Sequence, residues 1–240
     1  MKKIIAVAAA LAFGAVSAFA LDITVGARGN FNMGLGTTLT KDGETYLVDY
    51  QKAYFEMSGL SVDSWKEAGN LGGGFGVYAN FGLMELGGGS LGVQPEIGMN
   101  FNNGWNVKSK LSYGPVSTDY EETVSFISLD IPVLVTYTYP VLDALSVGGG
   151  AGVYLSFPMK PTMSMKLDGE EMGDSDDDST CKMNFGLAFD VNAGYKVGPG
   201  SIVLDVRYML DLTPLTDSDG DEGILTRRML TIGAGYQIKF

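Results

Sequence analysis

Apolar and polar residues alternate at every second position through eight segments of the chain. In residues 22–35, for example, Ile23 and Val25 fall on one face, whereas Thr24 and Arg28 fall on the other. This period of two predicts β-strands that each have one apolar face. The predicted strands comprise residues 22–35, 71–83, 90–102, 123–138, 144–157, 182–196, 201–212 and 226–240.

The connections between these segments alternate in length. The short ones are residues 84–89, 139–143 and 197–200, and the long ones are residues 36–70, 103–122, 158–181 and 213–225. An even number of strands, with short turns at one end and long loops at the other, is typical of barrels that cross a bacterial outer membrane. We therefore expect an all-β fold, an eight-stranded antiparallel up-and-down transmembrane β-barrel with short periplasmic turns and long extracellular loops.

The first twenty residues have the pattern of a secretory signal peptide. Lys2 and Lys3 precede an apolar stretch at residues 4–16, and Ala18 and Ala20 are the small residues of a cleavage site. An uncleaved anchor helix is the alternative, but the apolar stretch is short for a membrane span. We expect residues 1–20 to be removed and residues 21–240 to form the barrel domain in the outer membrane.

Charged residues on the polar faces indicate which side of the barrel faces the lipid. A charge that faces lipid at mid-depth costs about 2–4 kcal/mol when it is Arg or Lys, so these side chains should point into the lumen. An eight-stranded barrel is only wide enough for side chains to fill. The six candidates for a structural charge network in the lumen are Arg28, Glu96, Asp130, Asp190, Asp205 and Arg207.

The last segment ends in an aromatic residue. Phe240 follows Ile238 and Tyr236 at steps of two, which makes a closing strand of the form that the barrel-assembly machinery recognises. An ordinary edge strand that happens to end in Phe is the alternative interpretation. Together with the signal peptide and the loop alternation, these three residues are candidates for an assembly signal.

Four stretches of the chain carry a resemblance to a known family. They are Gln94-Pro95-Glu96-Ile97-Gly98, Leu129-Asp130-Ile131-Pro132-Val133-Leu134, Gly148-Gly149-Gly150-Ala151-Gly152-Val153-Tyr154 and Asp205-Val206-Arg207-Tyr208. On these stretches the chain resembles the small outer-membrane β-barrel proteins called porin-family or PorT-like, whose architecture is that of the OmpA/OmpX group. The resemblance implies an eight-stranded barrel that is not an open pore, and a role in secretion, adhesion or envelope integrity.

Charge limits the partners that the chain can have. Without Lys2 and Lys3 the chain has 14 basic and 28 acidic residues, a net charge of −14, of which the four long loops carry −13. This charge argues against nucleic acid, whose phosphates need a basic surface. The expected partners are outer-membrane lipid, the assembly machinery and extracellular proteins. Divalent cations could also bind the acidic runs at residues 174–178 and 217–222, but neither run has calcium-loop spacing, so a solvated loop is preferred.

The first long loop contains more apolar residues than a solvated loop needs. They are Tyr46, Val48, Tyr50, Tyr54, Phe55, Met57, Leu60, Val62 and Trp65. These residues could extend the flanking strands, form a short helix over the mouth of the barrel, or make a contact patch for a partner.

An enzymatic function is not expected. The chain contains no histidine, and its single cysteine, Cys181, therefore has no histidine to activate it. No cofactor and no metal site are expected either. We predict a structural or interaction barrel that displays acidic loops, with a narrow porin-like channel as the second interpretation and a soluble exported ligand-binding β-barrel as the third.

Overall fold

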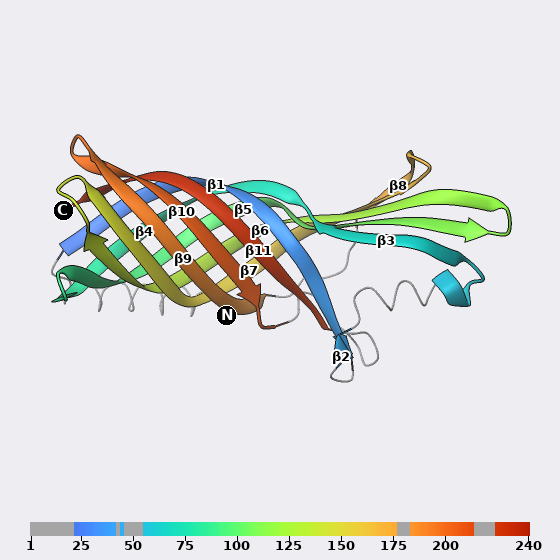
Figure 1. Ribbon diagram of the computed structural model, residues 1–240, viewed down its shortest axis with the longest axis horizontal. Coiled ribbons are helices and arrows are strands. Elements are labelled where there is room, and N and C mark those ends of the chain that lie inside the picture. The colour runs from blue at the N-terminus through green and yellow to red at the C-terminus, as the bar shows by residue number, and fades with distance from the viewer. Residues whose placement is uncertain (1–21, 42–43, 46–54, 177–182, 214–223) are drawn as a thin grey trace.

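The computed structural model describes residues 22–41, 44–45, 55–176, 183–213 and 224–240, and this part of the chain is almost entirely β-structure (Figure 1). The predicted signal peptide lies outside the described residues. The strands are β1 (Asp22–Lys41), β2 (Glu44–Thr45), β3 (Ser61–Gly69), β4 (Leu71–Leu86), β5 (Gly89–Tyr113), β6 (Val116–Pro140), β7 (Leu145–Leu167), β8 (Glu170–Asp176), β9 (Asn184–Val197), β10 (Gly200–Asp211) and β11 (Ile224–Lys239).

Eight of these strands close into a barrel. Their order is β1-β4-β5-β6-β7-β9-β10-β11, each pair is antiparallel, and β11 pairs with β1 to complete the circle. Each of the eight corresponds to one strand predicted from the alternation of apolar and polar residues. The prediction of an eight-stranded antiparallel barrel is therefore confirmed.

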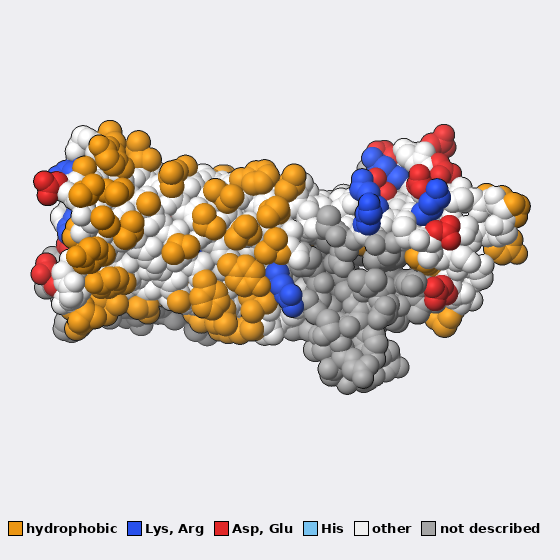
Figure 2. All heavy atoms as spheres, viewed as in Figure 1, with side chains coloured by type: hydrophobic (Ala, Val, Ile, Leu, Met, Phe, Trp, Pro, Cys, Tyr) orange, Lys and Arg blue, Asp and Glu red, His pale blue; other side chains and the backbone are white. Residues whose placement is uncertain are grey.

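The outer surface of the barrel is apolar. Side chains at every second position point away from the lumen, and many are well exposed, such as Val191 at 65 % and Leu204 at 60 %. Figure 2 shows these side chains over the visible face of the barrel, with charged groups beyond them at the ends. The soluble ligand-binding barrel is therefore wrong, because its outer surface would have to be polar. Within the described part of the chain, no helix is long and apolar enough to span a membrane.

Short turns close one end of the barrel, which we call the turn end. The β4–β5 turn contains Gly87 and Gly88, both with positive φ, and the β9–β10 turn contains Gly198 with a φ of 62°. Two-residue hairpin turns need this backbone region, and glycine enters it without a steric cost. The opposite end, from which the long connections emerge, is the loop end.

Two of the long connections continue as β-structure instead of forming loops. Residues 103–122 belong to β5 and β6, which turn at Gly114 and Pro115, and residues 158–176 belong to β7 and β8, which turn at Asp168 and Gly169. Gly-Pro and Asp-Gly pairs are hairpin signals in the sequence. With β3 they form the projecting sheet (residues 61–69, 104–125 and 162–176), whose strand order is β3-β5-β6-β7-β8. Figure 1 shows this sheet extending well beyond the barrel.

The first long loop contains one of the expected structures, a strand, and its short helix lies at the far end of the projecting sheet and not over the mouth of the barrel (Figure 1). Residues 61–69 pair with β5 as a strand, and residues 55–57 form one short helical turn. Tyr46, Val48, Tyr50 and Tyr54 lie outside the described residues, as do Cys181 and the acidic run at residues 217–222.

Candidate functional site

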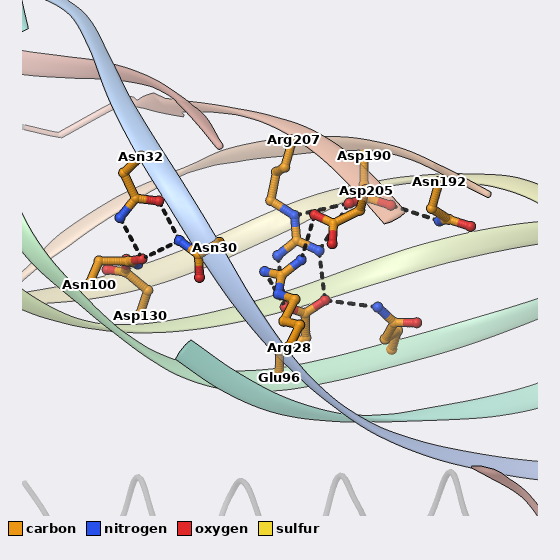
Figure 3. A network of polar contacts seen from close by, with 11 residues as sticks. Arg28, Asn30, Asn32, Glu96, Asn100, Asp130, Asp190, Asn192, Asp205 and Arg207 are labelled. Carbon is orange, nitrogen blue, oxygen red and sulfur yellow. Dashed lines mark hydrogen bonds and ion pairs between the residues drawn. The ribbon is translucent and has the colours of Figure 1, made fainter. Parts of the chain in front are cut away.

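Five of the six predicted lumen charges form one ion-pair cluster, which we call the arginine cluster. Arg207 binds Glu96 through two hydrogen bonds of 2.7 and 2.8 Å, and also donates to Asp190 at 3.2 and 3.3 Å. Arg28 pairs with Glu96 at 3.0 Å and with Asp205 at 3.1 Å. Figure 3 shows the two guanidinium groups between the carboxylates. Because charged hydrogen bonds satisfy each ion, burial of Arg207 at 1 % exposure is tolerated.

Strand register places the members of this cluster. Arg207 on β10 lies directly opposite Asp190 on β9, while Glu96 reaches Arg207 across the lumen from β5. Glycines on neighbouring strands leave room for the large side chains. A Cβ atom at Gly233 would clash with the Asp205 carboxylate, and one at Gly235 would crowd the side chain of Arg28.

Asp130 is not part of the arginine cluster. Its carboxylate accepts hydrogen bonds from Asn100, Ser128 and Ser156, and Asn100 in turn accepts from Asn30 and Asn32. Figure 3 shows this asparagine network at a distance from the two arginines. The expectation that Arg28 and Arg207 face all four acids is therefore wrong for Asp130. This acid lies nearer the loop end, where β5, β6 and β7 bring amides and hydroxyls to it.

A third lumen arginine was missed in the sequence. Arg227 on β11 is 2 % exposed, and its Nη2 donates to Asp211 Oδ1 at 3.5 Å and to Ser156 Oγ at 3.4 Å. Tyr154 also donates to Asp211, and the Arg227 guanidinium lies 5.4 Å from the centre of the Phe126 ring. The sequence did contain a signal for it, because Arg227 lies four residues before Thr231 and therefore falls on the same polar face of β11.

An apolar cluster crosses the lumen beside these networks, although the polar faces predicted a polar interior. It contains Leu134, Tyr154, Ala188, Met209 and Met229, each between 0 and 3 % exposed, from five neighbouring strands. We call it the lumen plug. Single apolar residues on polar strand faces give no clear sequence signal, because only barrel closure brings them together.

The lumen contains a cavity at the turn end, so side chains do not fill the barrel there. A cavity of about 520 Å³ reaches the arginine cluster and is lined mainly by hydroxyl, amide and charged groups. Lys239 and Asp22 form a 2.6 Å ion pair among its lining residues. The arginine cluster lies at the inner end of this cavity, and the lumen plug lies farther toward the loop end.

The projecting sheet has one buried face and one charged face. Val107 and Leu111 are 2 % and 6 % exposed, and Phe55 packs edge-on against Tyr120 with 5.2 Å between ring centres. On the other face, Lys108 pairs with Glu121 at 3.0 Å. Hydrogen bonds from Lys108 and Asn106 hold the pKa of Glu121 below its usual value, while burial and Glu122 raise the pKa of Tyr120 above the ordinary range.

The three predicted assembly residues lie on the outer surface at the turn end. Phe240 is 77 % exposed and its backbone N–H donates to the Ile23 carbonyl at 2.8 Å, next to β1. Tyr236 and Ile238 are each partly exposed on β11. Among the residues that the structure describes, no group of three or more acidic, histidine or cysteine side chains is placed to hold a metal ion.

A closed β-barrel with an apolar belt and a polar, charged lumen defines a membrane-spanning barrel protein. The sequence model of the family described as outer membrane protein beta-barrel domain matches residues 17–217, and the chain belongs to this family. The chain is therefore a small outer-membrane β-barrel protein, as the resemblance implied. Among curated proteins, none matches the sequence.

Three solved structures with a similar course of the chain are distant in sequence. Neisserial surface protein A is 15 % identical with a TM-score of 0.40, and OprG from Pseudomonas aeruginosa is 13 % identical with a TM-score of 0.40; both alignments cover 91 % of this chain and 97 % of the other. Ail, the attachment invasion locus protein of Yersinia pestis, solved with the heparin analogue sucrose octasulfate, is 11 % identical, with 91 % and 100 % covered and a TM-score of 0.37.

Proposed function

We propose that this protein is a closed, non-enzymatic outer-membrane barrel that displays the projecting sheet to the cell exterior as an interaction surface. The observation that supports a closed barrel is the succession of two barriers in the lumen. The arginine cluster joins side chains from β1, β5, β9 and β10 at one level, and the lumen plug joins buried side chains from five strands at another. The sheet beyond the barrel is the part of the described chain left to meet other molecules.

The role of the six predicted charges follows from the same geometry. In this proposal Arg28 and Arg207 neutralise Glu96, Asp190 and Asp205 and tie β1, β5, β9 and β10 together, while Asp130 organises the asparagine network. Asp211 and Arg227 join them as structural residues. Paired charges in this arrangement give the lumen a fixed structure.

Several features that the structure does not test belong to the same proposal. Signal peptidase removes residues 1–20, and the assembly machinery recognises Tyr236, Ile238 and Phe240 at the end of β11. Acidic loops, including residues 174–178 and 217–222, give the exposed surface its negative charge. No reaction is assigned, because the chain lacks histidine, Glu96, Asp190 and Asp205 are held in ion pairs, and Asp130 accepts hydrogen bonds from the asparagine network.

Conductance is the measurement that tests the closed barrel. Purified protein in planar lipid bilayers should show no steady current. Met209→Gly tests the lumen plug, and Met183→Gly is the matched control because Met183 is exposed on the outer surface. Large, reproducible channels in the wild-type protein would favour the narrow porin-like channel and contradict the proposal.

Orientation is tested separately by labelling on intact cells. In a Cys181→Ser background, Ser117→Cys in the projecting sheet should react with an impermeant thiol reagent. Pro199→Cys in the β9–β10 turn should react only after the outer membrane is opened. The reverse pattern would place the projecting sheet in the periplasm.

A further inference from the structure

The end of the projecting sheet farthest from the barrel carries exposed apolar side chains (Figure 2). Tyr113 and Val116 flank the β5–β6 turn and are 71 % and 64 % exposed, and Met57 is 80 % exposed. The turn after the short helix brings residues 57–60 alongside, since a Cβ atom at Gly59 would lie 4.0 Å from the Tyr113 ring. We call Met57, Tyr113 and Val116 the apolar cap.

The fold does not require these three side chains. Backbone pairing from Ser112↔Ser117 inward holds the hairpin, and Leu111, which is 6 % exposed, packs on its buried face. The cap side chains extend beyond that buried face into solvent. They also lie far from the lipid belt, so lipid cannot explain their exposure as it does for the barrel. Large apolar side chains grouped in water mark sites of interaction.

Charge around the apolar cap limits what can bind it. Asp63 accepts a hydrogen bond from Ser112. Asp119 lies opposite Lys110 on the same hairpin, three residues nearer the barrel than Tyr113 and Val116. Over residues 55–69, 104–125 and 160–176 the sequence has eleven acids and five lysines. An apolar contact on a sheet with a surplus of acids is complementary to an apolar pocket surrounded by basic groups.

We propose that the apolar cap anchors the protein to a basic partner protein, by inserting Tyr113 into an apolar pocket that has a cationic rim. This inference rests on the proposed function and names its partner class. Tyrosine is common among the residues that dominate binding energy, because it offers a large apolar area with few rotatable bonds. A second copy of the chain fits poorly, since two projecting sheets with a surplus of acids repel. A lipid surface fits poorly as well, because its headgroup region would have to receive the Asp63 carboxylate.

The test is selection of a random-peptide phage library on the full chain in zwitterionic lipid nanodiscs, with empty nanodiscs and the Tyr113→Ser variant for counter-selection. Enriched peptides should combine Lys or Arg with large apolar residues. A synthetic copy of the strongest peptide should lose about tenfold or more in affinity on Tyr113→Ser, and Tyr113→Phe should retain binding. Met172→Ser is the matched control, because Met172 is 65 % exposed on β8, away from the cap.

Three results would overturn the inference. These are peptides without basic residues, peptides that bind the Tyr113→Ser variant equally well, and no enrichment over empty nanodiscs. Co-flotation of the protein nanodiscs with separate zwitterionic vesicles, abolished by Tyr113→Ser, would identify a lipid surface as the partner instead. All of these leave the closed barrel intact, whereas steady conductance of the wild-type protein would refute the proposed function whatever the peptides show.

Discussion

Strands β5 and β6 pass through two regions of the molecule in which the polarity of their faces is reversed. Inside the barrel, Glu96 and Asp130 point into the lumen, and apolar residues such as Val133 point outward. In the projecting sheet, Val107 and Leu111 are buried, and charged residues cover the opposite face. The same two strands therefore present apolar groups outward to lipid in one region and inward, away from water, in the other.

A bulge allows one strand to serve both environments. The register of β5 with β6 shifts between Asn100 and Asn103, and Asn102 has a φ of 55° there. The buried polar side chains on β5 before the bulge, Glu96 and Asn100, have even numbers, whereas buried side chains after it, such as Val107, have odd numbers. An extra residue exchanges the two faces of a strand, because side chains alternate with a period of two. The outward face of β5 is therefore apolar where it meets lipid and polar where it meets water. The bulge at residues 101–102 exchanges the two faces of the strand between these regions.

The largest contrast between the regions is expected for charge removal. Arg207→Met leaves Asp190 buried without its arginine and leaves Glu96 with Arg28 alone, and breaking a buried ion pair typically costs about 3–5 kcal/mol of unfolding free energy. Lys108→Met removes one member of an exposed pair and should cost about 0.2–1 kcal/mol. Urea unfolding in lipid vesicles, followed by heat-modifiable migration on gels, measures both. Equal stability of Arg207→Met and wild type would contradict the structural role of the arginine cluster.

The cost of inserting a charge on β6 should differ nearly as much between the barrel and the projecting sheet. Val133 faces lipid midway between Ile127 and Tyr139, so Val133→Lys should cost about 2–4 kcal/mol. Ser117→Lys lies on the same strand in the projecting sheet and should change stability by at most about 0.5 kcal/mol. The unfolding assay above compares the two variants. A tolerated lysine at Val133 would show that this face of β6 does not contact lipid.

Replacing a turn glycine, in contrast, should reduce the unfolding free energy by the same amount in both regions. Gly114 in the projecting sheet and Gly198 at the turn end have φ values of 59° and 62°, and an added Cβ would meet nothing within 4 Å at either site. Replacement by Ala therefore adds only the backbone penalty of the left-handed region, about 1 kcal/mol at each position. Unequal losses in unfolding free energy would mean that one of the turns has a second role.

The smallest effect concerns pH. Lys108 and Asn106 lower the pKa of folded Glu121, so its contribution is present above the unfolded pKa and is lost as the pH falls through the folded pKa. Because the ion pair is exposed, the contribution should be a few tenths of a kcal/mol. Wild type should exceed Glu121→Gln in stability at pH 7, and the difference should shrink as the pH falls below the unfolded Glu pKa of about 4.3 and through the lower folded pKa. A difference that stays constant as the pH is lowered through this range would show that the carboxylate charge is not its cause.

Part of this structure could be read from the sequence because strand geometry is local. Side chains alternate with a period of two whatever the neighbouring strands are, so eight strands, an apolar outer face and inward charges such as Arg207 were predictable. Gly114-Pro115 and Asp168-Gly169 are also hairpin signals, although the length of the connections that contain them predicted loops.

Tertiary structure alone decided which inward groups meet. Arg207 reaches Glu96 over 111 residues of sequence, Asp130 joins amides instead of arginines, and Met209 and Met229 become part of the lumen plug. Contacts across a lumen depend on the tilt and stagger of all eight strands together, and alternation along one strand contains no information about them. The sequence by itself therefore determined which face each barrel residue occupies, whereas barrel closure determined its partners.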